Sequence, residues 1–176
     1  MSEAQAASDR GVSATTPDWS REHKAMFEWS PARALLAAIR SYQRHRRGTG
    51  PWHGLCRRLA VLRHRFWQVV AGSDIPINAQ LGGGLMLPHP NGIVIHPDAV
   101  VGPNCLLFHQ VTLGTNGTGK APTLGGHVDV GAGARILGGV VIGDHARIGA
   151  NAVVLCDVPA GATAIGVPAK VLPPRG

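Results

Sequence analysis

Aromatic residues are scarce in this chain. They make up 5% of its 176 residues, whereas glycine occurs 24 times. A sandwich or an α/β core of this length normally contains more phenylalanine, tyrosine and tryptophan, so the composition disfavours a broad core. The hydrophobic fraction is nevertheless 44%, mostly alanine, valine, leucine and isoleucine, which predicts a narrow aliphatic core and argues against disorder throughout.

Long apolar runs and paired cysteines are also lacking. No apolar stretch approaches the roughly 18 residues of a transmembrane helix, and the polar first residues contain no apolar segment typical of a secretory signal. Cys56, Cys105 and Cys156 lie far apart in the sequence and form neither a disulfide framework nor a CxxC motif. We therefore expect a cytoplasmic protein with reduced cysteines and no bound metal.

Acidic residues are missing from one part of the chain. Residues 1–73 contain 12 basic and 5 acidic residues, which accounts for the whole net charge of +7, whereas residues 74–176 contain 5 of each. Nine arginines and no acidic residue lie between Arg33 and Arg65. We expect no nucleic-acid partner and favour helices with a solvated basic face. Because tryptophans accompany the arginines, a peripheral membrane contact of this segment stays open.

The N-terminal part divides into a flexible lead over residues 1–29 and a basic helical segment over residues 30–73. Ser30 and Pro31 are typical of a helix start and predict a helix over 31–45, which RRGTGP then ends. A second helix is predicted over 52–71, because apolar residues recur there at helical spacing and form one stripe: Leu55, Leu59, Leu62, Phe66 and Val69.

From residue 74 onward aliphatic residues recur every six positions. The members of this column are Ile75, Leu81, Leu87, Ile93, Val101, Leu107, Leu113, Leu124, Val130, Ile136, Ile142, Ile148 and Val154. A column of small or branched residues runs four positions later: Val128, Ala134, Val140, Ala146, Ala152 and Val158. Neither a helix nor an alternating strand has this period. It predicts a parallel β-helix, in which three six-residue units complete one triangular coil and the aliphatic side chains stack inside.

Two breaks in this spacing interrupt the coil. Ile93 and Val101 are eight residues apart, and Leu113 and Leu124 are eleven apart. The second break predicts a loop over 114–123 that protrudes from the regular coil, and long loops on rigid scaffolds tend to be functional. We accordingly divide the rest of the chain into a β-helix domain over 74–171 and a tail over 172–176.

The β-helix domain contains a series of motifs: SDIP, PHPNGIVI, HQVTLGT, GAGARILGGVVIG, IGANAVVL, DVP and GVPAKV. Between Asp74 and Val171 they resemble the bacterial serine acetyltransferases, a family of hexapeptide-repeat acyltransferases with a left-handed β-helix. The resemblance implies a mainly β fold of this kind behind a short α-helical N-terminal segment. It also implies a homotrimer, acetyl-CoA as co-substrate, a small-molecule hydroxyl acceptor, and a role in cysteine biosynthesis.

Acetyl transfer to a hydroxyl requires a base, and a neutral imidazole suits this task near pH 7. The resemblance places His89 at the position of the family's base and Asp74 at that of its carboxylate partner, fifteen residues earlier. Such a carboxylate fixes the tautomer of the imidazole and stabilises the imidazolium. His109 either lines this pocket or faces solvent.

For three further histidines of the β-helix domain and for Cys105 we expect no catalytic role. We expect His96, His127 and His145 to be solvated, because they fall at turns of the repeat. Cys105 falls in an inward column, so we expect a core residue there and direct transfer of the acetyl group without an acyl-enzyme.

The resemblance also indicates where acetyl-CoA binds. In the family its pantetheine arm follows a groove between coils of adjoining subunits, where small residues allow a close approach to the backbone. The matching positions are Gly114, Thr115, Ala132 and Ala150, and Lys170 is placed to meet the phosphates.

Some positions depart from the family's pattern. The family usually has an aspartate before the base, where this chain has Pro88, and a substrate-contacting histidine where it has Ala121. These departures leave L-serine and a hydroxyl of a sugar or exopolysaccharide precursor as alternative acceptors. The end LPPRG lacks the isoleucine that docks into the sulfhydrylase partner, so we expect no cysteine synthase complex. The family's larger helical domain is also shortened, which puts its contact between two trimers in doubt.

A non-catalytic scaffold and a zinc enzyme of the carbonic-anhydrase kind are the remaining alternatives. The second would need three histidine ligands, for which His89, His109 and His127 are the candidates.

Overall fold

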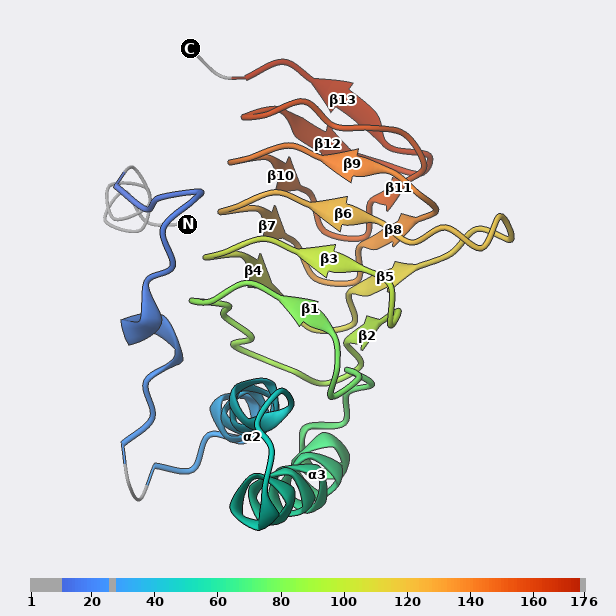
Figure 1. Cartoon of the computed structure of the whole chain (residues 1–176). Coiled ribbons are helices and arrows are strands. Elements are labelled where there is room, and N and C mark those ends of the chain that lie inside the picture. Colours follow the sequence, from blue (N-terminus) through green and yellow to red (C-terminus); the bar gives the residue numbers. More distant parts are fainter. Residues whose placement is uncertain (1–10, 26–27, 175–176) are drawn as a thin grey trace.

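The computed structural model describes residues 11–25 and 28–174, so residues 1–10, 26–27 and 175–176 of the predicted lead and tail lie outside the described residues. A short 3-10 helix, η1 (Trp19–Glu22), precedes the helices α2 (Pro31–His45) and α3 (Pro51–Ala71). Short strands follow (Figure 1): β1 (Gln80–Leu81), β2 (Val94–Ile95), β3 (Val100–Val101), β4 (Leu106–Leu107), β5 (Thr112–Gly114), β6 (Thr123–Leu124), β7 (Asp129–Val130), β8 (Arg135–Leu137), β9 (Val141–Ile142), β10 (Arg147–Ile148), β11 (Val153–Val154), β12 (Thr163–Ile165) and β13 (Lys170–Leu172).

The strands form the three faces of a prism. The β1 sheet has the order β1-β3-β6-β9, the β2 sheet has the order β11-β8-β5-β2, and the β4 sheet has the order β13-β12-β10-β7-β4. All pairs are parallel except β12 with β13. The chain visits the β1, β4 and β2 sheets in turn, so three strands complete one coil and equivalent strands stack.

The interior of the prism is the predicted column of aliphatic residues. All thirteen members of the six-residue column are buried, and so are all six members of the column four positions later. Each two-residue strand directs its first side chain outward and its second inward. The predicted fold, a left-handed parallel β-helix behind a short helical segment, is therefore confirmed.

The corners of the prism require left-handed backbone. Asn104, Gln110, His127, His145 and Asn151 have φ between 52° and 60° although none of them is glycine. Such φ values are uncommon outside glycine, and asparagine and histidine tolerate them better than most residues. The corners therefore turn the chain within a few residues from one sheet to the next, and each strand then stacks on the equivalent strand of the preceding coil.

The two helices lie at the β1 end of the prism, remote from β13 (Figure 1). Both begin with proline in the first helical turn. Helix α3 ends at Ala71, and Gly72 caps it with a left-handed φ of 62° and an N–H that donates to the carbonyls of Gln68 and Val69. Leu35 and Ile39 of α2 are buried in the same cluster as Ile75. Helix α2 thereby covers the open end of the coil. Both predicted helices are confirmed to within one residue.

Part of the predicted flexible lead is held against the coil. The side-chain amide of Asn104 donates to the carbonyls of Ser13 and Thr16 at 2.7 and 2.8 Å, and its Oδ1 accepts from the N–H of Asp18 at 2.8 Å. Arg40 of α2 contacts Glu22 at 2.7 Å, a largely buried pair. Residues 13–22 thus form an ordered arm along the prism.

The segment between β5 and β6 extends away from the prism as a loop (Figure 1). It contains the second break of the six-residue spacing, so the extra residues leave the coil and do not distort it. The two extra residues of the first break lie between Met86 and Val94, earlier than the sequence indicated, because Met86 pairs with Leu106 whereas Val94 pairs with Thr112. Within residues 11–25 and 28–174 no helix combines the length and the apolar character needed to cross a membrane.

Candidate active site

His89 lies exposed at the corner where the chain passes from the β4 sheet to the β2 sheet. We call this edge of the prism the His89 edge. His109 occupies the same edge one coil further, and its ring meets that of His89 edge-on, with centroids 6.1 Å apart and planes at 76°. Two imidazoles of different coils are therefore presented together to solvent. The ring of His109 therefore faces solvent and also adjoins the predicted base.

Ala132 and Ala150 continue the His89 edge in the next two coils. Backbone hydrogen bonds connect the successive corners: the N–H of Gly133 donates to His109 O at 2.9 Å, and the N–H of Asn151 donates to Ala132 O at 2.8 Å. A Cβ at Gly131 would lie 2.6 Å from the nitrogen of Ala150, so glycine is needed for the coils to approach this closely. The edge is consequently a row of two histidines and two small residues.

Asp74 lies at the start of the β2 sheet, next to Val94. Its N–H donates to Ile93 O at 2.7 Å and its carbonyl accepts from the N–H of Ile95 at 2.9 Å, so its backbone is fixed. Its exposed carboxylate accepts a hydrogen bond from the side-chain amide of Gln68 at 3.0 Å. The described hydrogen bonds do not join Asp74 to His89 within one chain. A shallow groove between the end of α3 and the prism contains Asp74 and is lined otherwise by Val69, Val94 and their neighbours.

Gly114 and Thr115 lie at the other end of the β5 strand from the His89 edge. Gly114 ends β5, where its carbonyl accepts from the N–H of Gly138 at 2.9 Å, and Thr115 begins the protruding loop. Lys170 lies exposed in β13, at the last coil. One chain therefore unites Ala132 and Ala150 with the histidines, but it does not bring Gly114, Thr115 or Lys170 to that edge.

Two polar residues near the site were given no role by the sequence. Gln68 bonds to the Asp74 carboxylate from the last turn of α3, and Arg135 of β8 lies exposed beside the His89 edge, with its guanidinium donating to Gly133 O at 3.3 Å. The sequence could have indicated Arg135, because this residue directly follows the GAGA motif. No periodic signal marks Gln68, because its role depends on where α3 meets the coil.

The prediction that His127 is solvated is wrong. His127 is 6% exposed, and its Nδ1 lies 2.9 Å from Nδ1 of His145. The corners stack these two rings, and Ala14 of the N-terminal arm covers the adjacent Gly126. This corner joins the β1 and β4 sheets, so one chain does not assemble His89, His109 and His127. Among the described residues no group of three or more metal-ligating side chains occurs.

Comparison with known proteins identifies the family to which this sequence is similar. Residues 121–156 match the family described as "Bacterial transferase hexapeptide (six repeats)". The serine acetyltransferase of Helicobacter pylori is 43% identical over 133 residues, which cover 67% of this chain and 78% of that protein. The serine acetyltransferase of Escherichia coli is 37% identical over 153 residues, covering 84% of this chain and 55% of that protein.

Solved structures give the same result. Soybean serine acetyltransferase matches with a TM-score of 0.65 and 36% identity over 81% of this chain. The serine acetyltransferase of Brucella abortus matches with a TM-score of 0.71 and 31% identity over 84% of this chain. The chain spans 56% and 59% of the lengths of these two proteins. The fold and these relatives place the chain among the hexapeptide-repeat acyltransferases. Within that class, the chain belongs to the serine acetyltransferase family.

Proposed function

We propose that the protein transfers the acetyl group of acetyl-CoA to the hydroxyl of L-serine. The observation that carries this proposal is the His89 edge, where an exposed imidazole heads a row of small residues on a rigid coil. The relatives support serine as the acceptor, because the proteins described above are named serine acetyltransferases and the soybean enzyme has been solved complexed with serine. They give no support to the sugar alternative.

In the proposed reaction His89 acts as the general base. It takes the proton of the serine hydroxyl as the oxygen attacks the thioester carbonyl; the carbon–sulfur bond then breaks, and the imidazolium returns the proton to the departing thiolate. The Asp74 carboxylate stabilises the imidazolium. Transfer is direct. Burial raises the pKa of the Cys105 thiol to about 12, so this cysteine is not an acyl carrier.

The co-substrate is proposed to lie along the His89 edge. Ala132 is half-buried and Ala150 is exposed, so neither blocks access of a pantetheine arm to the backbone of the corners. Arg135 adds a cation beside this edge. Gly114, Thr115 and Lys170 are proposed to contact acetyl-CoA from a neighbouring subunit, since one chain keeps them apart from the edge. This arrangement requires the homotrimer. The absence of a cysteine synthase complex and a cytoplasmic location stay predictions.

A thiol-release assay tests the proposal. Purified protein with acetyl-CoA should release coenzyme A upon addition of L-serine, and the His89→Ala variant should not. Nucleotide sugars and other hydroxy amino acids serve as competing acceptors, since Pro88 and Ala121 offer no charged group to an amino acid. Release of coenzyme A with a sugar but not with serine would mean that the acceptor is a sugar and not L-serine. Release with no acceptor, or equal release by the His89→Ala variant, would refute the proposed chemistry.

A further inference from the structure

Helix α3 presents an apolar face to solvent. Leu55, Leu59, Leu62, Phe66 and Val69 are spaced four, three, four and three residues apart, so they form one stripe along the helix. We call it the α3 stripe. Its side chains are between 49% and 82% exposed, and Trp52, at 67%, extends it toward the start of the helix. A surface helix normally turns such a stripe toward the core.

The stripe cannot be the face that packs on this chain. The opposite side of α3 already does so, through the buried residues Ala60, His64 and Ala71. His64 Nε2 lies 2.8 Å from the carbonyl oxygen of Ile75, which fixes the rotation of the helix against the first coil. Contiguous exposed apolar surface of this kind marks an interaction site.

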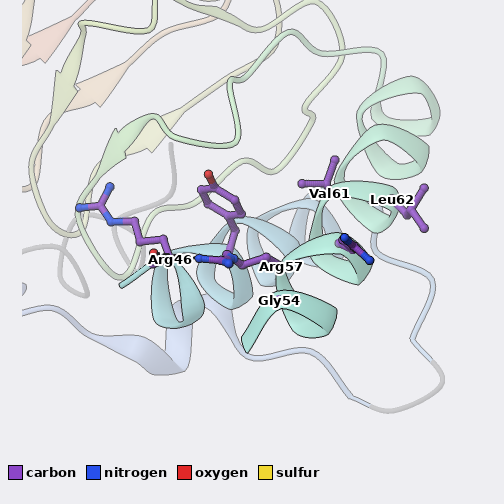
Figure 2. Close-up of a pocket in the computed structure, with 7 residues that line it drawn as sticks. Arg46, Gly54, Arg57, Val61 and Leu62 are labelled. Carbon is purple, nitrogen blue, oxygen red and sulfur yellow. Dashed lines mark hydrogen bonds between the residues drawn. The ribbon is translucent and has the colours of Figure 1, made fainter. Parts of the chain in front are cut away.

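Arginines border the stripe on both sides. Helical geometry places Arg58 and Arg65 along one margin and Arg63 along the other, and all three are exposed. Arg46 and Arg57 extend the cationic surface into the groove between α2 and α3, which Figure 2 shows together with Leu62. Residues 31–73 contain no acidic residue to neutralise these charges.

We propose that the α3 stripe binds the surface of a membrane that contains anionic lipids, with α3 parallel to the membrane plane. Apolar side chains flanked by cations are the features with which interfacial helices bind such surfaces. A second copy of the chain fits less well, because joining two α3 stripes would bring their arginine margins together without acidic partners in either helical segment. Because both helices lie at one end of the prism, the coil would project away from the lipid (Figure 1).

Vesicle sedimentation with the full chain tests this proposal. Vesicles of phosphatidylcholine containing phosphatidylglycerol are compared with vesicles of phosphatidylcholine alone, at low and high salt. The wild-type protein should sediment with the anionic vesicles and be released by salt. A Leu62→Gln/Phe66→Gln variant should bind at least about tenfold more weakly, and an Arg58→Gln/Arg65→Gln variant should lose most of its preference for anionic lipid.

The matched control is Val141→Gln/Leu155→Gln, which removes two exposed apolar side chains of the prism and should bind like the wild type. Thermal melting and light scattering verify that each variant keeps its fold and mass. Absence of sedimentation with anionic vesicles overturns the proposal, as does equal binding by the stripe variant. A change of oligomeric mass in the stripe variant would assign this face to a second copy, and binding to duplex DNA in place of vesicles would assign it to nucleic acid.

Discussion

The side-chain amide of Gln68, in the last turns of α3, donates a hydrogen bond of 3.0 Å to the carboxylate of Asp74. Only five residues separate the two positions in sequence, yet they belong to different parts of the fold, the basic helical segment and the β-helix. Gly72 ends the helix between them and lets the chain turn back so that they meet. The helical segment therefore contributes directly to the surroundings of the proposed dyad.

We predict that Gln68→Ala lowers kcat and leaves the KM for acetyl-CoA unchanged, because Asp74 loses the group that orients its carboxylate. One hydrogen bond of this kind contributes about 0.5–1.5 kcal/mol, which corresponds to a loss of about 2- to 13-fold in rate. Steady-state kinetics measure it, with Gln80→Ala, an exposed glutamine of β1, as the control. Wild-type kcat in the Gln68→Ala variant would show that the contact does not serve catalysis.

His89→Ala should reduce kcat by about 10²- to 10⁴-fold, since it removes the proposed general base. The melting temperature should stay near that of the wild type, because the side chain is exposed at a corner. His109→Ala is the matched comparison, a histidine on the same edge 6.1 Å from His89 between ring centroids. We expect it to lose less activity. Near-normal turnover in a folded His89→Ala variant would mean that the base lies elsewhere.

Asn104→Gly should release the N-terminal arm without disturbing the coil. Glycine keeps the backbone of residue 104, which has a φ of 60°, and removes the three side-chain hydrogen bonds to the arm. Hydrogen exchange at the N–H of Asp18 should accelerate, and trypsin should cleave after Arg21 sooner than in the wild type. Asn151→Gly, a second left-handed corner, is the control. Unchanged exchange at Asp18 would contradict a role of Asn104 in holding the arm.

The coil could be predicted from the sequence because its determinants are local and periodic. Each aliphatic residue of the column occupies its own six-residue unit, so the spacing alone identified the thirteen inward positions, all of which are buried. The same arithmetic applies to the His89 edge. His89 and His109 are 20 residues apart, or 18 without the two extra residues that lie between Met86 and Val94. His109 and Ala132 are 23 apart, or 18 without the five extra residues before Leu124.

Contacts between parts of the chain were not predictable in this way. His127 is buried at a corner where its ring contacts His145 of the next coil and where Ala14 of the N-terminal arm covers the neighbouring Gly126. Both contacts involve residues remote in sequence, so the residues adjacent to His127 do not predict them. The α3 stripe was recognised, but its pattern does not tell whether the apolar side faces this chain or a partner. The contact between Gln68 and Asp74 likewise depends on the angle at which α3 reaches the coil.

Cys105 gives the stability of the protein a defined dependence on pH. It is fully buried, its thiol donates to Gly125 O at 3.2 Å, and burial raises its pKa from 9.0 to about 12. A thiol is neutral when protonated, so the folded state keeps this proton at pH values where the unfolded chain has lost it. Between about pH 9 and 12 the free energy of unfolding therefore falls as the pH rises, by up to about 1.4 kcal/mol per pH unit. Below about pH 9 the thiol is protonated in both states, so it adds no pH dependence to the free energy of unfolding.

Cys105→Ala should flatten this alkaline decline, because alanine fits an inward column that already contains Ala134 and Ala146 and has no proton to lose. Urea unfolding at fixed protein concentration, under reducing conditions and from about pH 8 to about pH 11, measures the effect. Cys156→Ala is the control, because Cys156 is exposed and its removal should leave the slope unchanged. Comparison of the curves of the three proteins therefore isolates the contribution of Cys105. Parallel curves for the wild type and Cys105→Ala would mean that the folded chain releases this proton as readily as the unfolded one.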